Sequence, residues 1–164
     1  MNKTLLFLAV VSLTLLSCGD KEDEFHHRTI NVNNLSDEIV YVMGDLWYPN
    51  HMSFSCALVY GNGCKTNPKE VNKKALDLGN NSFYEYNFGV MSDTLWIYVL
   101  DSVKLNSGVT SLDAVRQCYG VTLSDLYRLN WTISYPPTPE MKDIKMYPVY
   151  SESAKEETDE KDKG

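Results

Sequence analysis

Hydrophobic and polar residues alternate along two stretches near the start of the chain, and this alternation predicts β-strands. Residues 28–33 (RTINVN) and 38–43 (EIVYVM) are rich in β-branched side chains, and the turn-forming segment 33–37 joins them. A further strand is predicted at 54–60. Residues 61–81 show no clear period, so we expect a long irregular excursion there.

The middle of the chain continues the strand pattern. Residues 82–90 (SFYEYNFGV) alternate between two sets of side chains and predict another strand. Residues 95–100 (LWIYVL) are almost continuously apolar, which is typical of a central strand buried on both faces. Strand chemistry returns at 131–135, and 144–147 predict a short edge strand.

Helical spacing occurs late in the chain. A first helix is predicted over 112–119. Thr122 and Asp125 form a capping-box pattern that opens a second helix over 123–130. The whole pattern predicts one α+β domain over residues 28–150, dominated by antiparallel sheet, with two short C-terminal helices.

A different hydrophobic run opens the chain. Residues 5–16 are nearly all apolar and follow Lys3. As a helix this run is about 18 Å long, whereas the hydrocarbon core of a bilayer is about 30 Å thick. The run is too short to span a membrane, and its charge, length and ending are typical of a secretory signal peptide over residues 1–17.

The signal peptide ends in Leu15-Leu16-Ser17-Cys18, which resembles the lipobox of bacterial lipoproteins. The resemblance implies cleavage before Cys18, a diacylglycerol on its sulfur and a further acyl chain, such as palmitate, on its amine. Each buried methylene contributes about 0.8 kcal/mol, so two or three chains hold a protein firmly on a membrane. The alternative is a plain signal peptide with an incidental cysteine.

The residues after Cys18 are acidic. Residues 19–27 carry four acids and one lysine, and we expect residues 18–27 to be a solvated tether. Lys21-Glu22-Asp23 resembles the export signal of Bacteroidota surface lipoproteins, which implies an outer-membrane protein that faces the cell exterior. A generic spacer without a sorting role is the alternative.

The charge of the whole chain bears on which classes of partner it can bind. The formal net charge is −7, but much of it lies in the tether and in residues 151–164, an acidic tail that we expect to be disordered. Removal of residues 1–17 from the 164-residue chain leaves 147 residues, enough for one domain with a core. No basic cluster of the kind that binds nucleic acid is present in the sequence.

Three cysteines remain beside Cys18. Cys56 and Cys64 bracket a tight-turn signal, so a disulfide across that hairpin is geometrically plausible. Cys118 falls in the first predicted helix and is expected to be a buried small hydrophobic residue. The sequence offers no zinc-site spacing, and we predict neither a metal nor a cofactor.

Two wider resemblances bear on function. Residues 93–150, with segments such as LSDLYRLNWTISYPP and MKDIKMYPVY, are similar to small Bacteroidota lipoproteins of unassigned function, a family that implies no catalytic residue. Residues 111–130 are similar to the helix pair of LysM domains, which implies binding to N-acetylglucosamine polymers. The alternative is that any two short capped helices give this apolar spacing.

The sequence favours binding over catalysis. His26 and His27 lie in the tether, where adjacent residues of a flexible segment seldom build a rigid site, and no nucleophile has a base at a suitable spacing.

Four aromatic residues lie near prolines at loop ends, where they could stack on sugar rings: Trp47, Tyr48, Trp131 and Tyr135. They could equally be core residues, as most tryptophans and tyrosines are.

Two hydroxyls lie in short acid-hydroxyl-apolar motifs. Thr94 and Ser102 resemble sites at which Bacteroidota O-glycosylate exported proteins, or they are turn and strand-edge residues. Together these observations predict a non-catalytic envelope lipoprotein whose partners are membrane lipid, through acylated Cys18, and a protein or glycan. A glycan-binding module is the alternative, and an enzyme comes third.

Overall fold

The computed structural model describes residues 25–46, 65–79 and 82–151, and these residues form an α+β fold rich in antiparallel pairing. The strands are β1 (Thr29–Asn34), β2 (Val40–Asp45), β3 (Lys65–Thr66), β4 (Glu70–Asp77), β5 (Leu95–Asp101), β6 (Val115–Val121), β7 (Thr132–Tyr135) and β8 (Lys145–Tyr147). The α-helices are α4 (Tyr84–Val90), α5 (Ser102–Asn106) and α6 (Leu123–Arg128), and the 3₁₀ turns are η2 (Leu112–Ala114) and η3 (Pro139–Met141).

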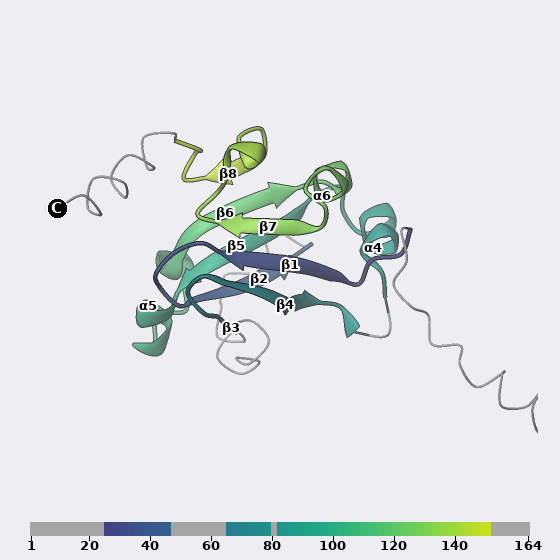
Figure 1. Cartoon of the computed structure of the whole chain (residues 1–164). Helices are drawn as coiled ribbons and strands as arrows, with labels where there is room; N and C mark the ends of the chain where they lie inside the picture. The colour runs from purple at the N-terminus through teal and green to yellow at the C-terminus, as the bar shows by residue number, and fades with distance from the viewer. Residues whose placement is uncertain (1–24, 47–64, 80–81, 152–164) are drawn as a thin grey trace, which may run out of the picture.

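The strands form two sheets that lie across one another (Figure 1). The larger sheet has the order β3-β2-β5-β6-β8 and is antiparallel throughout. The smaller sheet has the order β4-β1-β7, in which β1 pairs antiparallel with β4 and parallel with β7. In Figure 1, α4 and α6 lie at one end of the sheets and α5 lies at the other.

The main core lies between the sheets. Ile30 and Val32 from the smaller sheet face Ile97 and Tyr119 from the larger one, and all four are almost completely buried. The hydroxyl of Tyr119 donates a 2.9 Å hydrogen bond to the carbonyl of Ser134, so one side chain joins β6 to β7. Burial raises the pKa of Tyr119 well above its ordinary value, and the hydroxyl therefore stays protonated as the donor.

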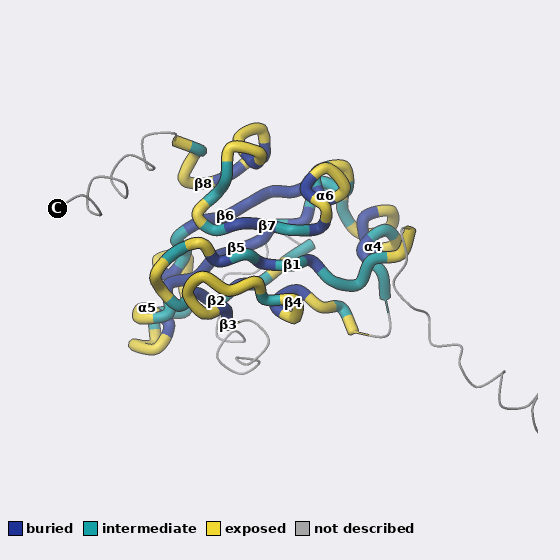
Figure 2. Tube along the Cα trace, in the orientation of Figure 1, coloured by how far each residue is buried: buried dark blue, intermediate teal, exposed yellow. Residues whose placement is uncertain are grey.

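Much of this architecture agrees with the sequence pattern. The α+β class with dominant antiparallel pairing is confirmed. Strands are confirmed near 28–33, 38–43, 131–135 and 144–147. The continuous apolar run at 95–100 is the central strand of its sheet, and Figure 2 shows that β5 and β6 are mostly buried.

The strand predicted over 82–90 is wrong, because this segment is helix α4. Its apolar residues fit both the two-residue period of a strand and the 3.6-residue period of a helix. The helix buries Tyr84, Asn87 and Phe88, of which the last two lie three and four residues after the first. The Tyr84 hydroxyl donates to the carbonyl of Leu76 at 2.9 Å and fixes the helix against β4. This contact and the burial of one face of α4 favour the helical period.

The helix predicted over 112–119 is also wrong. Its first residues form the short turn η2, and the rest is strand β6. Cys118 and Tyr119 are buried on opposite faces of the larger sheet, which a surface helix would not allow. Two short helices do lie in the C-terminal half, α5 and α6, and the capping box of Thr122 and Asp125 on α6 is confirmed.

Strand β4 and helix α5 were not predicted from the sequence. β4 lies within the expected excursion at 61–81, and its first five residues are largely exposed and polar, so they show no hydrophobic alternation. Helix α5 has five residues, too few for a periodic signal. The strand predicted over 54–60 lies outside the described residues.

Candidate functional site

The larger sheet carries a second set of apolar and aromatic side chains on the face that points away from the main core. Strand register places Trp96 of β5 opposite Gly120 of β6, and Gly120 opposite Lys145 of β8. The next row on this face contains Tyr98, Cys118 and Tyr147. Because alternate residues of a strand share a face, these two rows form one continuous surface. We call it the outer face.

Glycine at position 120 lets the indole ring of Trp96 lie across β6. A Cβ atom at this position would lie 3.1–3.4 Å from three atoms of that ring. The ammonium of Lys145 lies over the same ring, 5.0 Å from its centroid. This cation–π contact links the indole to β8.

A groove of about 480 Å³ opens on the outer face. Its walls combine aromatic and aliphatic side chains with one guanidinium and one thiol: Trp96, Tyr98, Leu112, Val115, Arg116, Cys118, Tyr147 and Pro148. Tyr147 is 56% exposed at the rim, whereas Tyr98 is 3% exposed. Ligand sites combine apolar walls with a few fixed polar groups, and this groove has that composition.

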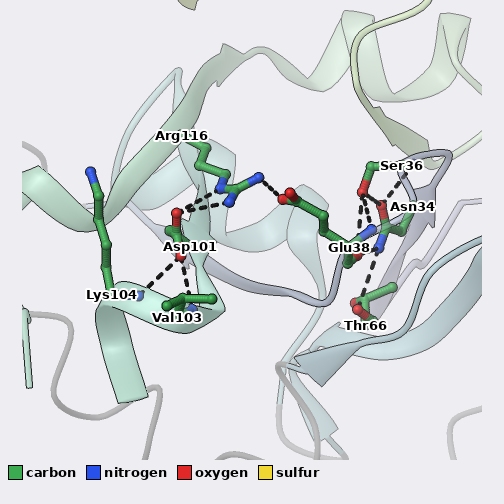
Figure 3. Close-up of polar contacts among 8 residues, drawn as sticks. All are labelled: Asn34, Ser36, Glu38, Thr66, Asp101, Val103, Lys104 and Arg116. Carbon is green, nitrogen blue, oxygen red and sulfur yellow. Dashed lines mark hydrogen bonds and ion pairs between the residues drawn. The ribbon is translucent and has the colours of Figure 1, made fainter. Parts of the chain in front are cut away.

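The guanidinium of Arg116 is fixed at one wall by two carboxylates (Figure 3). Its Nε and one terminal nitrogen donate to Oδ2 of Asp101 at 3.0 and 2.8 Å, and its other terminal nitrogen pairs with Glu38. The second oxygen of Asp101 accepts from the backbone of Val103 and Lys104, which caps α5. Arg116 is therefore neutralised locally and immobilised by bonds to the end of β5 and to the loop before β2.

The loop that carries Glu38 is itself anchored (Figure 3). The side-chain amide of buried Asn34 donates to the carbonyl oxygens of Glu38 at 2.7 Å and Asn67 at 3.0 Å. Its carbonyl oxygen accepts from the hydroxyl of Ser36 at 2.7 Å. Asn34 thereby joins β1 to the loop before β2 and to the turn after β3, so that Glu38 is held close to Arg116.

The thiol of Cys118 lies in the groove, but it is poorly suited to nucleophilic chemistry. Burial raises its pKa to about 12, an effect that the charge of Lys145 offsets only in part. The reactive species of a cysteine is the thiolate, and at neutral pH this side chain is the thiol. The prediction of a buried Cys118 is confirmed, although the residue lies on a strand instead of a helix.

A second organised cluster involves the segment before β1. The ring of His27 stacks on Trp131, with centroids 3.9 Å apart and planes inclined by 10°. The Nδ1 atom of His27 lies 2.6 Å from Oε1 of Glu85, and the His27 backbone N–H donates to the same carboxylate. The backbone N–H of Tyr84 donates to the His27 carbonyl at 2.8 Å, and the Tyr127 hydroxyl reaches Glu85 at 3.3 Å. His27 is thus fixed on α4 and α6, contrary to the expectation that it belongs to a flexible tether.

The aromatic residues predicted as ligand contacts do not form one site. Trp131 is 5% exposed and belongs to the main core, so its assignment as a sugar-stacking residue is wrong and the core interpretation is confirmed. Tyr135 is partly buried against that core. Trp47 and Tyr48 lie outside the described residues, as does the disulfide predicted between Cys56 and Cys64.

The two candidate glycosylation sites lie at opposite ends of β5. Thr94 precedes the strand, is partly exposed and donates a 2.9 Å hydrogen bond to Asp93. Ser102 follows the strand as the first residue of α5 and is also partly exposed. These positions agree with the expected flanks of the strand, and O-glycosylation of either residue stays a prediction.

The residues of the groove were not predicted from the sequence. The signal was present, because LWIYVL alternates Trp96 and Tyr98 against Leu95 and Ile97, and a strand buried on both faces implies a second apolar surface. Arg116 and Cys118 could not be predicted as groove residues, because both lie in a segment that the sequence predicted to be helical.

The helix pair on which the LysM resemblance depended is not formed, because β6 occupies the place of its first helix. None of the helices in the described ranges has the length and apolar character needed to cross a membrane. Within residues 25–46, 65–79 and 82–151, no three His, Cys, Asp or Glu side chains gather to hold a metal ion. In comparisons with known proteins, the chain matches no family model, no curated protein and no solved structure.

Proposed function

We propose that this chain is a lipid-anchored protein of the cell envelope whose folded domain binds a partner without chemical turnover. The anchor is Cys18, at the end of a lipobox-like sequence that follows a signal-type apolar run. The acidic segment after Cys18 supports placement on the outer membrane, facing the cell exterior. The groove on the outer face is the observation that carries the binding role, because its aromatic walls and paired charges suit recognition.

The anchor is tested by growing cells that express the full chain with an alkyne analogue of palmitate. The chain should incorporate the label and sediment with membranes. A Cys18→Ser variant should lose both properties, while Cys118→Ser, which keeps the lipobox, should retain them. Labelling that persists in Cys18→Ser would contradict the proposed anchor.

A neutral glycan is the second candidate, as the ligand of the groove. The exposed ring of Tyr147 offers apolar surface to the C–H face of a sugar ring, beside the apolar walls of the groove. The fixed charge of Arg116 is already paired with Asp101 and Glu38, and the thiol of Cys118 is neutral. The ammonium of Lys145 lies over the ring of Trp96, and the walls themselves are mainly aromatic and aliphatic, which favours a neutral ligand.

Binding of the mature protein to an array of neutral and acidic glycans tests this second candidate. We expect saturable binding to neutral glycans that falls at least tenfold in Tyr147→Ala, which removes an exposed rim residue. Val71→Ala is a matched control, because Val71 is 48% exposed on the smaller sheet and should leave the affinity unchanged. Equal loss in both variants, or selective binding to acidic glycans, would contradict the assignment.

A further inference from the structure

We propose that the end of the domain formed by α4, α6 and the segment Phe25–His27 rests on the lipid surface, so that the domain has a fixed orientation on the membrane. This inference rests on the proposed acylation of Cys18. It adds an interaction surface, with the headgroup region of the bilayer as the partner. Figure 1 shows that the described chain begins at this end.

Large exposed hydrophobic side chains gather at this end. They come from the initial segment, from α4 with the residue after it, and from α6: Phe25 (65% exposed), Tyr86 (64%), Val90 (63%), Met91 (44%) and Tyr127 (46%). Tyr86 and Val90 are four residues apart, so they share one face of α4. Tyrosine and phenylalanine side chains are common where a protein meets the membrane interface.

The segment leading to the anchor is fixed at the same end. The backbone of His27 bonds to the carboxylate of Glu85 and to the backbone N–H of Tyr84, and its ring stacks on Trp131. The ring of His26 contacts Phe83 at a centroid distance of 5.0 Å. The chain therefore leaves the domain next to the exposed hydrophobic residues and continues from there toward Cys18.

The length of chain beyond this point limits the orientation. Phe25 is seven residues after Cys18, which gives a maximum reach of about 25 Å at roughly 3.3–3.6 Å per residue. A domain of this size is about 35 Å across. A tether shorter than the domain cannot pass around it, so the α5 end cannot rest on the lipid while Cys18 is embedded.

The charges of this end favour a surface without net charge. Residues 19–24 carry four acids and one lysine next to the anchor, which disfavours a strongly anionic membrane. The carboxylate of Glu85 already pairs with His27 and accepts a hydrogen bond from the hydroxyl of Tyr127. Arg128 of α6 is paired with Asp125, so it is not a dedicated contact for lipid phosphate. We therefore expect docking on zwitterionic lipid, driven by apolar burial.

The test uses acylated protein purified from membranes and reconstituted in phosphatidylcholine vesicles brominated on the acyl chains, because bromine quenches tryptophan fluorescence at close range. Tyr86→Trp and Val90→Trp report on the α4 end. Tyr147→Trp and Val149→Trp are matched controls of similar exposure elsewhere on the domain. Fluorescence of the parent protein supplies the background from its native tryptophans.

We expect the added tryptophan at 86 or 90 to be quenched at least threefold more than the one at 147 or 149. Equal quenching of both pairs in protein whose acylation is verified by mass spectrometry would overturn the orientation and leave the anchor intact. An unacylated N-terminus would overturn both.

Discussion

The imidazole ring of His27 lies flat on the indole ring of Trp131, with their centroids 3.9 Å apart. Trp131 follows α6 with a positive φ of 54°, a backbone conformation that residues other than glycine adopt infrequently. Two residues from distant parts of the sequence thereby fix both the end of α6 and the beginning of the domain. This contact determines where the chain leaves the fold on its way to Cys18.

Replacing His27 with alanine should release the initial segment. The variant loses the ring stack and the hydrogen bond to Glu85, so we expect the free energy of unfolding to fall by about 1–3 kcal/mol. Urea unfolding of the mature chain measures this change. His26→Ala, in which the more exposed of the two histidines is removed, should cost less than about 1 kcal/mol. Equal effects of the two substitutions would contradict a specific role for His27.

Gly89→Ala should stabilise the protein, since Gly89 lies in the last turn of α4 and, apart from the helix's own backbone and its chain neighbours, a Cβ atom there meets nothing within 4 Å. Alanine is favoured over glycine in a helix by about 0.5–1 kcal/mol, so the midpoint of urea unfolding should rise. A lowered midpoint would mean that residues 84–90 do not form the helix.

Gly120→Val should damage the outer face. The added side chain meets the ring of Trp96, over which the Lys145 ammonium also lies, so the indole must move. Overpacking of this kind costs about 1–3 kcal/mol. Near-ultraviolet circular dichroism should show a changed tryptophan environment, and any glycan affinity of the groove should fall. An unchanged spectrum would show that Trp96 does not lie across β6.

Loss of the Arg116 guanidinium should be costly because its partner Asp101 is 9% exposed. Arg116→Met leaves that carboxylate without its charged partner, and we expect a loss of about 2–4 kcal/mol. Arg116→Lys should recover only part of it, since an ammonium cannot make the same two-nitrogen contact.

The control is Lys69→Met, because Lys69 pairs with Asp37 at an exposed position and should contribute about 0–1 kcal/mol. Guanidinium chloride would screen these charges, so urea is the suitable denaturant for all three variants. A loss for Arg116→Met no larger than the control would contradict the role of the Arg116 network.

The capping box of α6 should depend on pH. Burial raises the pKa of Asp125, but hydrogen bonds from the hydroxyl and backbone N–H of Thr122, together with Arg128, outweigh burial and hold that pKa below its ordinary value of 3.8. A carboxyl with a lowered folded-state pKa stabilises the fold above its unfolded-state pKa, and this contribution is lost as the pH falls through the folded-state value.

Asp125→Asn should therefore lower the free energy of unfolding by about 1 kcal/mol at pH 7, and by less as the pH falls below 3.8. Urea unfolding at several pH values measures the difference. A cost that is the same at pH 7 and pH 3 would contradict the assigned pKa shift.

Local sequence pattern is sufficient to predict some elements of this fold. The apolar run at 95–100 predicted a central strand, and Thr122 with Asp125 predicted the start of α6, because each signal is complete within a few residues. The segment 82–90 fits both the helical and the strand period, and tertiary packing, including the contact of Tyr84 with β4, favours the helix.

The candidate site is built from residues that only the three-dimensional fold brings together. The groove requires β5, β6 and β8 to be neighbours, and β6 was predicted as a helix, so Trp96, Cys118 and Tyr147 could not be placed together. The docking of His27 requires α4 and α6, which are far apart in the sequence. Long-range pairing of this kind is set by tertiary packing instead of local propensity.

Acylation of Cys18 is the claim on which the membrane placement and the orientation both depend. Intact-mass and peptide mass spectrometry of the mature protein, purified from membranes in detergent, tests it most directly. We predict an N-terminal peptide that begins at residue 18 and carries a diacylglycerol on sulfur with a further acyl chain on nitrogen. A mature chain that begins elsewhere, or a free thiol at residue 18, would contradict the account.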